Sequence, residues 1–268
     1  MKYMIQTGML GAQILDEGFS LAKQLGFDAL ELTSYGGKTL EELVAEAALA
    51  AERYGIAARA LCGGYRGWIG HFDEEKRAMA VNDIGKAMKI CADVGIQGII
   101  APAAYGMHSN CLPPHRAPRT AQEDRAVLVD SLLRIAESAE KHETLLYLEP
   151  LNRYEDHMLN TLEAAMDLIK AVDCKNIRLM LDLFHGSIEE ASLAVSAGKY
   201  ASFIGHVHLA DSNRLLPGQG HTDFRSVFNA LKANGFDGYL SYECGFPGKR
   251  DKAKELADSL NYLKTLDN

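Results

Sequence analysis

The sequence is poor in cysteine, and the few cysteines that it has form no recognisable motif. They are odd in number, scattered along the chain and free of any Cys-x-x-Cys pair: Cys62, Cys91, Cys111, Cys174 and Cys244. Such a set argues against a disulfide framework and against a zinc knuckle. It indicates reduced thiols in a cytoplasmic protein.

The chain also lacks an excess of positive charge and a long apolar run. Lysine and arginine number 28 against 36 acidic residues, the net charge is -8, and no basic cluster occurs. Nucleic-acid binders usually show the opposite balance, so DNA or RNA is not expected as a partner. No stretch approaches membrane-spanning length, and Asp16 and Glu17 would interrupt the apolar part of a signal peptide. We therefore expect a cytoplasmic protein without a membrane partner.

What the sequence does contain is a regular alternation of strand-like and helix-like stretches. The expected strands are Tyr3–Gly8, Asp28–Thr33, Ile56–Leu61, Gly98–Pro102, Thr144–Leu148, Ile177–Asp182, Phe203–Asp211 and Tyr239–Glu243. Each is followed by an expected helix: Ile14–Leu25, Leu40–Tyr54, Asp73–Val94, Ala121–Lys141, Thr161–Val172, Ile188–Ala197, Phe224–Ala233 and Lys252–Leu266. Strands that alternate with helices of this length predict a parallel sheet.

Eight such units, without a linker between them, predict the α/β class and a (β/α)₈ TIM barrel formed by a single domain over residues 1–268. The alternative is an open doubly wound sheet. That fold normally begins with a glycine-rich phosphate-binding turn, which this sequence lacks. In barrels of this kind the active site lies at the carboxyl ends of the strands.

Polar side chains stand at the ends of the last four expected strands. These residues are Glu149, Asp182, His208 and Glu243. Three carboxylates and one imidazole form an oxygen-rich site that suits a hard or borderline divalent ion. His206 competes with His208, because alternate residues of a strand point to the same face. We interpret His206 as a hydrogen-bonded histidine inside the barrel and His208 as the ligand.

Several short motifs stand out in the second half of the chain: Leu148–Glu155, Asp182–His185, His208–Arg214, Pro217–Gly220 and Tyr242–Cys244. These motifs resemble those of the sugar isomerase/epimerase barrels related to xylose isomerase. The resemblance is sharp only from residue 145 onward, and it is nearest to the ketose 3-epimerases of the tagatose/psicose group.

The resemblance implies a ketose 3-epimerase that interconverts the C3 epimers of a free ketose through a metal-stabilised enediolate. It implies one divalent ion per chain, usually manganese, with cobalt or magnesium as alternatives, bound by Glu149, Asp182, His208 and Glu243. Glu149 and Glu243 would also be the acid/base pair. The resemblance further implies that Glu155, His185 and Arg214 contact the substrate. It also implies that the protein forms a homodimer or a homotetramer.

The first half of the chain offers no comparable motif for the distal sugar hydroxyls. Gln6, Trp68 and His108 are candidates, although each is interpreted first as structural. The loop Met107–Pro118, with two histidines and three prolines, is interpreted as a lid or as an oligomer contact.

Three other functions stay open on the sequence alone. An aldose-ketose or hydroxypyruvate isomerase would use the same enediolate. An endonuclease IV-like DNA repair enzyme shares Asp182-x-x-His185 and His208-x-x-Asp211, but it needs an Asp-x-His pair that does not follow here, and the net charge opposes DNA. A catalytically inactive binding barrel is disfavoured because all four expected ligands are present.

Overall fold

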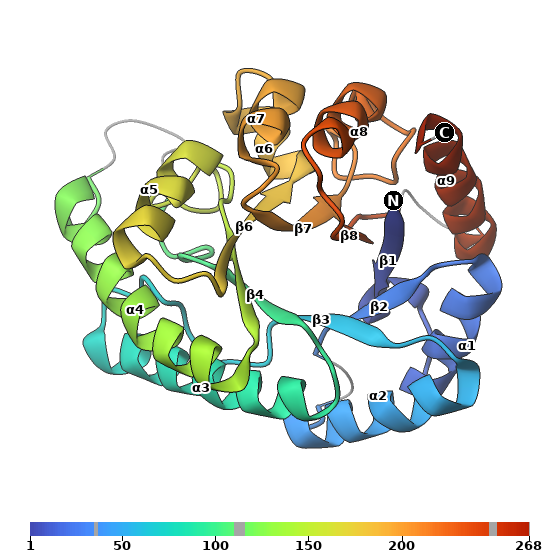
Figure 1. Ribbon diagram of the computed structural model, residues 1–268, viewed down its shortest axis with the longest axis horizontal. Helices are drawn as coiled ribbons and strands as arrows, with labels where there is room; N and C mark the ends of the chain where they lie inside the picture. Colours follow the sequence, from blue (N-terminus) through green and yellow to red (C-terminus); the bar gives the residue numbers. More distant parts are fainter. Residues whose placement is uncertain (35–36, 110–115, 247–250, 268) are drawn as a thin grey trace.

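The computed structural model describes residues 1–34, 37–109, 116–246 and 251–267. Eight parallel strands close into a barrel in the order of the chain, and the helices surround it (Figure 1). The predicted TIM barrel is thus confirmed, and the open sheet is excluded. None of the helices in these four ranges has the length and apolar character needed to cross a membrane.

The strands are short and end close to where the sequence predicted. They are β1 (Lys2–Gln6), β2 (Ala29–Leu32), β3 (Ala58–Cys62), β4 (Gly98–Pro102), β5 (Leu145–Glu149), β6 (Ile177–Asp182), β7 (Ile204–Leu209) and β8 (Tyr239–Tyr242). The helices of the described residues are α1 (Leu15–Leu25), α2 (Leu40–Tyr54), α3 (Glu74–Asp93), α4 (Ala121–His142), α5 (Leu162–Val172), α6 (Leu183–Glu189), α7 (Leu193–Tyr200), α8 (Phe224–Ala233) and α9 (Lys252–Asp267).

One predicted helix, Ile188–Ala197, is wrong, because two shorter helices, α6 and α7, cover this segment. Asp182 caps the first of them by accepting a hydrogen bond from the backbone N–H of His185 at 2.9 Å. Ser192 caps the second. Side-chain caps of this kind start helices. The early start of α6 places His185 in the first helical turn, next to the strand ends. A short 3₁₀ helix, Thr7–Leu10, was not predicted.

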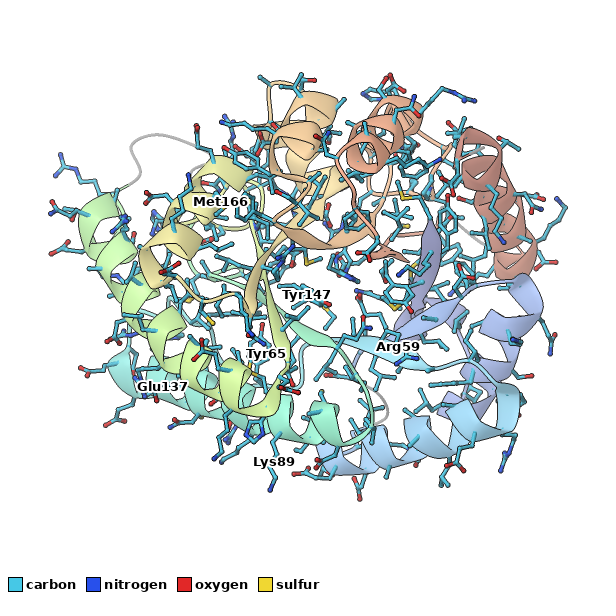
Figure 2. All side chains as sticks on the ribbon, in the orientation of Figure 1. Arg59, Tyr65, Lys89, Glu137, Tyr147 and Met166 are labelled. Atoms are coloured by element: carbon cyan, nitrogen blue, oxygen red, sulfur yellow. The ribbon has the colours of Figure 1, made fainter. Side chains whose placement is uncertain are left out.

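The barrel interior is filled by a small apolar cluster separate from the large core between strands and helices. Its buried members are Met4, Ala29, Ala60, Ile100, Tyr147 and Met180. Figure 2 shows Tyr147 near the centre of the barrel, whereas Lys89 and Glu137 lie on the outer helices. A Cβ atom at Gly205 would come within 2.8 Å of the Tyr147 ring, so only glycine leaves room for it there. The ring stacks on His206, with centroids 5.0 Å apart.

Strand β1 pairs with β8 to close the barrel, with Met4 opposite Ser241 and Ile5 opposite Tyr242. The amino group of Met1 lies 2.8 Å from Asp267, so the first and last described residues meet beside this seam. Residues from the two ends of the sequence therefore contribute to the same side of the barrel.

Candidate active site

The four predicted metal ligands converge at the carboxyl end of the barrel. Glu149 ends β5, Asp182 ends β6, His208 lies in β7, and Glu243 directly follows β8. One ligand atom from each lies within 4.8 Å of the others. The Nδ1 atom of His208 is 3.2 Å from Glu243, 3.4 Å from Glu149 and 3.7 Å from Asp182. The structure thus brings together all four residues that the strand-end pattern selected.

Three atoms of this cluster are buried and have no hydrogen-bond partner among the described residues: Glu149 Oε1, Asp182 Oδ2 and His208 Nδ1. Buried polar atoms are costly when nothing satisfies them, and almost all of them have a partner in folded proteins. These three point at one small space bordered by carboxylates. Oxygen ligands with one imidazole fit manganese, magnesium or cobalt, so the residues present fit a divalent ion.

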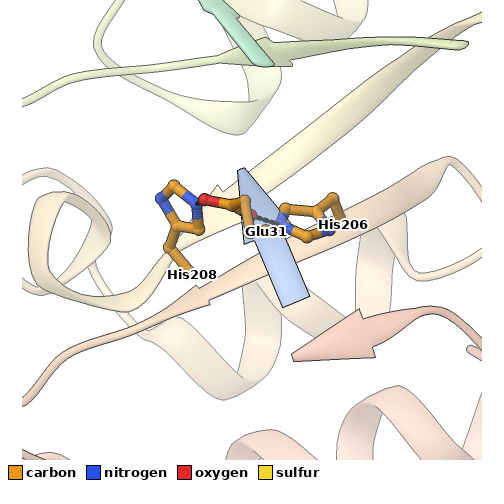
Figure 3. Close-up of side chains that lie close together, drawn as sticks. All are labelled: Glu31, His206 and His208. Atoms are coloured by element: carbon orange, nitrogen blue, oxygen red, sulfur yellow. Dashed lines mark hydrogen bonds and ion pairs between the residues drawn. The ribbon is translucent and has the colours of Figure 1, made fainter. Parts of the chain in front are cut away.

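Glu31 of β2 is a buried carboxylate that was not predicted as a site residue. It contacts the Nε2 side of the His208 ring, away from the three carboxylates of the cluster. Figure 3 shows it between two imidazoles: one oxygen lies 2.7 Å from Nε2 of His206 and the other 2.9 Å from Nε2 of His208. Burial alone would raise the pKa of Glu31, but the facing His208 and His206 hold it below its usual range. His206 is therefore a buried, hydrogen-bonded histidine, as predicted.

Gln6 links Glu31 to Glu243 by hydrogen bonds. Its side-chain amide donates one hydrogen bond to Glu31 at 2.8 Å and another to Glu243 at 2.9 Å. Both amide hydrogens are therefore used within the protein. Gln6 is structural here, in line with the first interpretation, and it is not positioned as a free donor for a sugar hydroxyl.

The two candidate acid/base residues have different electrostatic surroundings. Burial raises the pKa of the Glu149 carboxyl, and the charge of Glu243 raises it further. Burial also acts on Glu243, but His208 outweighs it and lowers the pKa of that carboxyl, with Arg214 assisting. A pair of carboxyl groups whose pKa values are pushed apart is suited to act as one acid and one base.

His185 and Arg214 direct hydrogen-bond donors to the same point. The backbone N–H of Asn152 donates to His185 Nδ1 at 3.2 Å, so a neutral His185 carries its proton on Nε2. That Nε2 atom lies 3.1 Å from Nη1 of Arg214. An arginine cannot accept a hydrogen bond. Both groups line the cavity, and a substrate oxygen beside the pair would accept a hydrogen bond from each. Asn152 was not recognised from the sequence.

The remaining predicted substrate contact, Glu155, lies beside these donors. One of its carboxylate oxygens is 4.0 Å from His185 Nε2, and the other accepts a hydrogen bond from Asn152 at 3.2 Å. Five of the predicted site residues thus line one cavity of about 330 Å³: Glu149, Glu155, His185, Arg214 and Glu243.

The other residues that line this cavity are largely apolar and aromatic. They are Cys62, Gly63, Tyr65, Trp68, Ile100, Pro102, Tyr105 and Leu151. The Trp68 ring packs between Tyr65 and Tyr105, with centroid distances of 6.4 Å and 6.0 Å. Trp68 therefore lies in the cavity, as one of the candidates for the distal part of a sugar. His108 does not line it and packs on His157 instead. Within the loop Met107–Pro118, residues 110–115 lie outside the described residues.

We expect removal of divalent ions to destabilise the protein. A ligand that binds only the folded state at 100 times its Kd adds about 2.7 kcal/mol of stability. Excess chelator should therefore lower Tm, and added Mn²⁺ should restore it, as measured by calorimetry. A Tm that is equal with and without chelator would contradict a tight ion site in this cluster.

Comparisons with known proteins agree with this architecture. The model of the xylose isomerase-like TIM barrel family matches residues 19–266. A 3-dehydro-D-guloside 4-epimerase of Escherichia coli (strain K12) is 40% identical over 93% of this chain and 94% of its own length. A crystal structure of 3-keto-D-glucoside 4-epimerase from E. coli superposes with a TM-score of 0.93 at 38% identity, and the match covers 99% of each chain.

Other relatives match over a smaller part of their length. A D-psicose 3-epimerase of Enterocloster bolteae is 38% identical over 44% of this chain and 39% of its own length. These relatives are named as epimerases, which are enzymes of the isomerase class. From the family match and the relative that spans nearly the whole chain, this protein belongs to the xylose isomerase-like TIM barrel family.

Proposed function

We propose that this chain is a divalent-metal-dependent sugar epimerase that inverts a hydroxyl-bearing carbon next to a ketone. The observation that carries the proposal is the convergence, in one cavity, of two carboxylates and two hydrogen-bond donors beside a cation site: Glu149 and Glu243 with His185 and Arg214. We further propose that the substrate is a 3-keto-glycoside, inverted at C4. The support for this choice is the 40% identical relative that spans 93% of the chain.

The reaction needs a proton removed from one face of the carbon and returned to the other. A carboxylate on each face performs this with no redox cofactor: one takes the proton, the other donates its own, and the configuration inverts. In our proposal Glu149 and Glu243 have these two roles. A divalent ion bound by the four ligands would stabilise the negative charge that develops on the carbonyl oxygen.

The donors at His185 and Arg214 would bind that developing charge as well. His185 Nε2 and Arg214 Nη1 lie 3.1 Å apart and both residues line the cavity, so an oxyanion beside the pair would accept a hydrogen bond from each. A charge-assisted bond from arginine to an oxyanion is stronger than a neutral one. Glu155, beside them, would accept a bond from a neighbouring hydroxyl.

The cavity favours an uncharged substrate. Arg214 is the only lysine or arginine among the described residues that line it, and its Nη2 already donates to Glu243 at 3.0 Å. A phosphorylated sugar would need a further cation or a set of N–H donors. The aromatic side formed by Tyr65, Trp68 and Tyr105 suits an apolar sugar face or an aglycone instead.

A free ketose inverted at C3 is the second candidate, as the sequence motifs predicted. The D-psicose 3-epimerase relative favours it, and the same groups would perform the same proton exchange. Aldose-ketose isomerisation would use the same proton removal but return the proton to the neighbouring carbon. A DNA-repair activity has no counterpart among the relatives reported above.

A substrate panel in deuterium oxide distinguishes these functions. The protein with Mn²⁺ would be given 3-keto-glucosides, D-psicose, D-tagatose and hydroxypyruvate, and the products would be analysed by NMR. Solvent deuterium at C4 of the glycoside is the expected result, and label only at C3 of a free ketose would move the assignment to the second candidate. Label at C1 would indicate an aldose-ketose isomerase, and turnover of none of these would contradict the proposal.

We expect His185→Ala and Arg214→Ala to slow turnover strongly without loss of the ion. Removal of one oxyanion donor typically costs about 3 kcal/mol, or a hundredfold or more in kcat. Metal analysis of each purified variant is the control, because neither residue is assigned as a ligand. Full activity in both variants would remove these residues from the mechanism.

The assembly and location of the protein remain predictions. We expect a homodimer or homotetramer in the cytoplasm. Light scattering of the purified protein tests the first expectation, and cell fractionation tests the second.

A further inference from the structure

Glu31 lies in a buried position, where a charged side chain has a high desolvation cost. The residue is fully buried in β2 between Leu30 and Leu32, which are themselves buried. A buried ionised carboxylate needs several hydrogen bonds to offset its loss of hydration. Even with those bonds, its net contribution to the stability of the fold is often small or unfavourable. Glu31 has three such bonds, from Gln6 at 2.8 Å, His206 at 2.7 Å and His208 at 2.9 Å.

The bond to His208 decides which ring nitrogen faces the cation site. Glu31 lies on the Nε2 side of the ring and accepts the Nε2–H. The carboxylates of Glu149, Asp182 and Glu243 lie on the Nδ1 side, at 3.2 to 3.7 Å. A histidine binds a metal through a nitrogen that carries no proton, and the bond made by its other nitrogen selects that atom.

His206 holds Glu31 in this position. It contributes the shortest of the three bonds, and its ring is fixed by stacking on Tyr147 at 5.0 Å. Figure 3 shows that the two imidazoles approach Glu31 from opposite sides, one at each carboxylate oxygen. The carboxylate therefore cannot turn without breaking one of these bonds.

We propose that Glu31, fixed by His206, is a positioning residue that keeps the proton of His208 on Nε2 and so presents Nδ1 to the divalent ion. This inference rests on the ion site of the proposed function but not on the identity of the sugar. Neither Glu31 nor His206 lines the substrate cavity, so their effect reaches the reaction through the residues that Glu31 contacts: His208 directly, and Glu243 by way of Gln6.

The test measures Mn²⁺ affinity by calorimetric titration in the absence of any sugar. Glu31→Leu removes the acceptor for both histidines and should weaken Mn²⁺ binding about 10- to 100-fold, the usual effect of losing a group that orients a metal ligand. Glu31→Gln keeps one acceptor oxygen, so its affinity for Mn²⁺ should lie between those of Glu31→Leu and the unaltered protein. An unchanged Kd in Glu31→Leu would overturn the proposal.

Asp211→Asn is the matched control. Asp211 is also a buried carboxylate with three N–H bonds, from Ser212, Gly218 and Thr222, but it is not part of the cation cluster. This variant should lose stability and keep its Mn²⁺ affinity. An equal loss of affinity in this variant would show that destabilisation alone accounts for the Glu31 result, and that outcome also contradicts the proposal.

The position of the His208 proton can also be measured by NMR in the unaltered protein, so this test does not depend on whether a variant folds. In ¹⁵N-histidine-labelled protein loaded with Mg²⁺, we expect Nε2–H signals of His206 and His208 that exchange slowly with solvent. Absence of the Nε2 proton on His208 would overturn the assignment. If the sugar assays fail while these results hold, the proposed substrate is wrong and the role of Glu31 stands.

Discussion

Glu149→Gln and Glu243→Gln are each expected to abolish net epimerisation, and the two variants should differ in the proton exchange that they retain. If the residues act from opposite faces of the sugar, each handles the proton of one epimer. General acid-base groups typically contribute about 10²- to 10⁴-fold to the rate, and an epimerisation that needs both loses at least one such factor. In deuterium oxide, either variant that keeps its ion should exchange the proton of one epimer through the surviving carboxylate.

Metal content is the necessary control, because both glutamates belong to the cation cluster. Label incorporated into the recovered substrate, followed by NMR, measures the retained half-reaction. The two variants should label opposite epimers. Interconversion at near the normal rate in either variant would show that a single base, or another group, performs the reaction.

Asp182→Asn is expected to lose most of the bound metal. Its Oδ2 is buried and has no hydrogen-bond partner in the part of the chain that the structure describes, whereas Oδ1 accepts the bond that caps α6. An asparagine can keep the capping oxygen and place a neutral amide at the ion. Changes beside a ligand already cost about 10- to 100-fold in metal affinity, so replacing the ligand itself should cost at least as much. Turnover should fall with metal occupancy.

The matched control is Asp156→Asn, another buried aspartate, which accepts three backbone N–H bonds and lies outside the cluster. Metal analysis after gel filtration should find the ion in the control and not in Asp182→Asn. Equal occupancy in the two proteins would remove Asp182 from the ligand set.

The barrel and the convergence of four strand-end residues could be predicted because both leave periodic signals in the sequence. Each ligand closes an apolar run, and the carboxyl ends of parallel strands meet at one end of a barrel, so proximity follows from topology. The boundaries of α2, α8, β4 and β6 were predicted without error. Helix α6 was missed because Asp182 was interpreted only as a ligand, whereas its Oδ1 also caps the helix.

The supporting residues could not be found in the same way. Glu31 stands alone in a short strand, and its meaning depends on two histidines about 175 residues away. The one local signal was a charged residue between two leucines in a predicted strand. Asn152 lies within a recognised motif, but its role follows from the orientation of the His185 ring, which no linear pattern encodes.

The bond between Gln6 and Glu243 joins residues 237 positions apart, across the seam where β1 meets β8. During synthesis, the first strand leaves the ribosome long before the last one exists. Once β7 has been synthesised, three of the four predicted ligands exist, but Glu243 and its partner in β1 are not yet together. A chain still being translated therefore lacks one member of the predicted ligand set, and we expect a divalent ion to bind tightly only after β1 and β8 have closed the barrel.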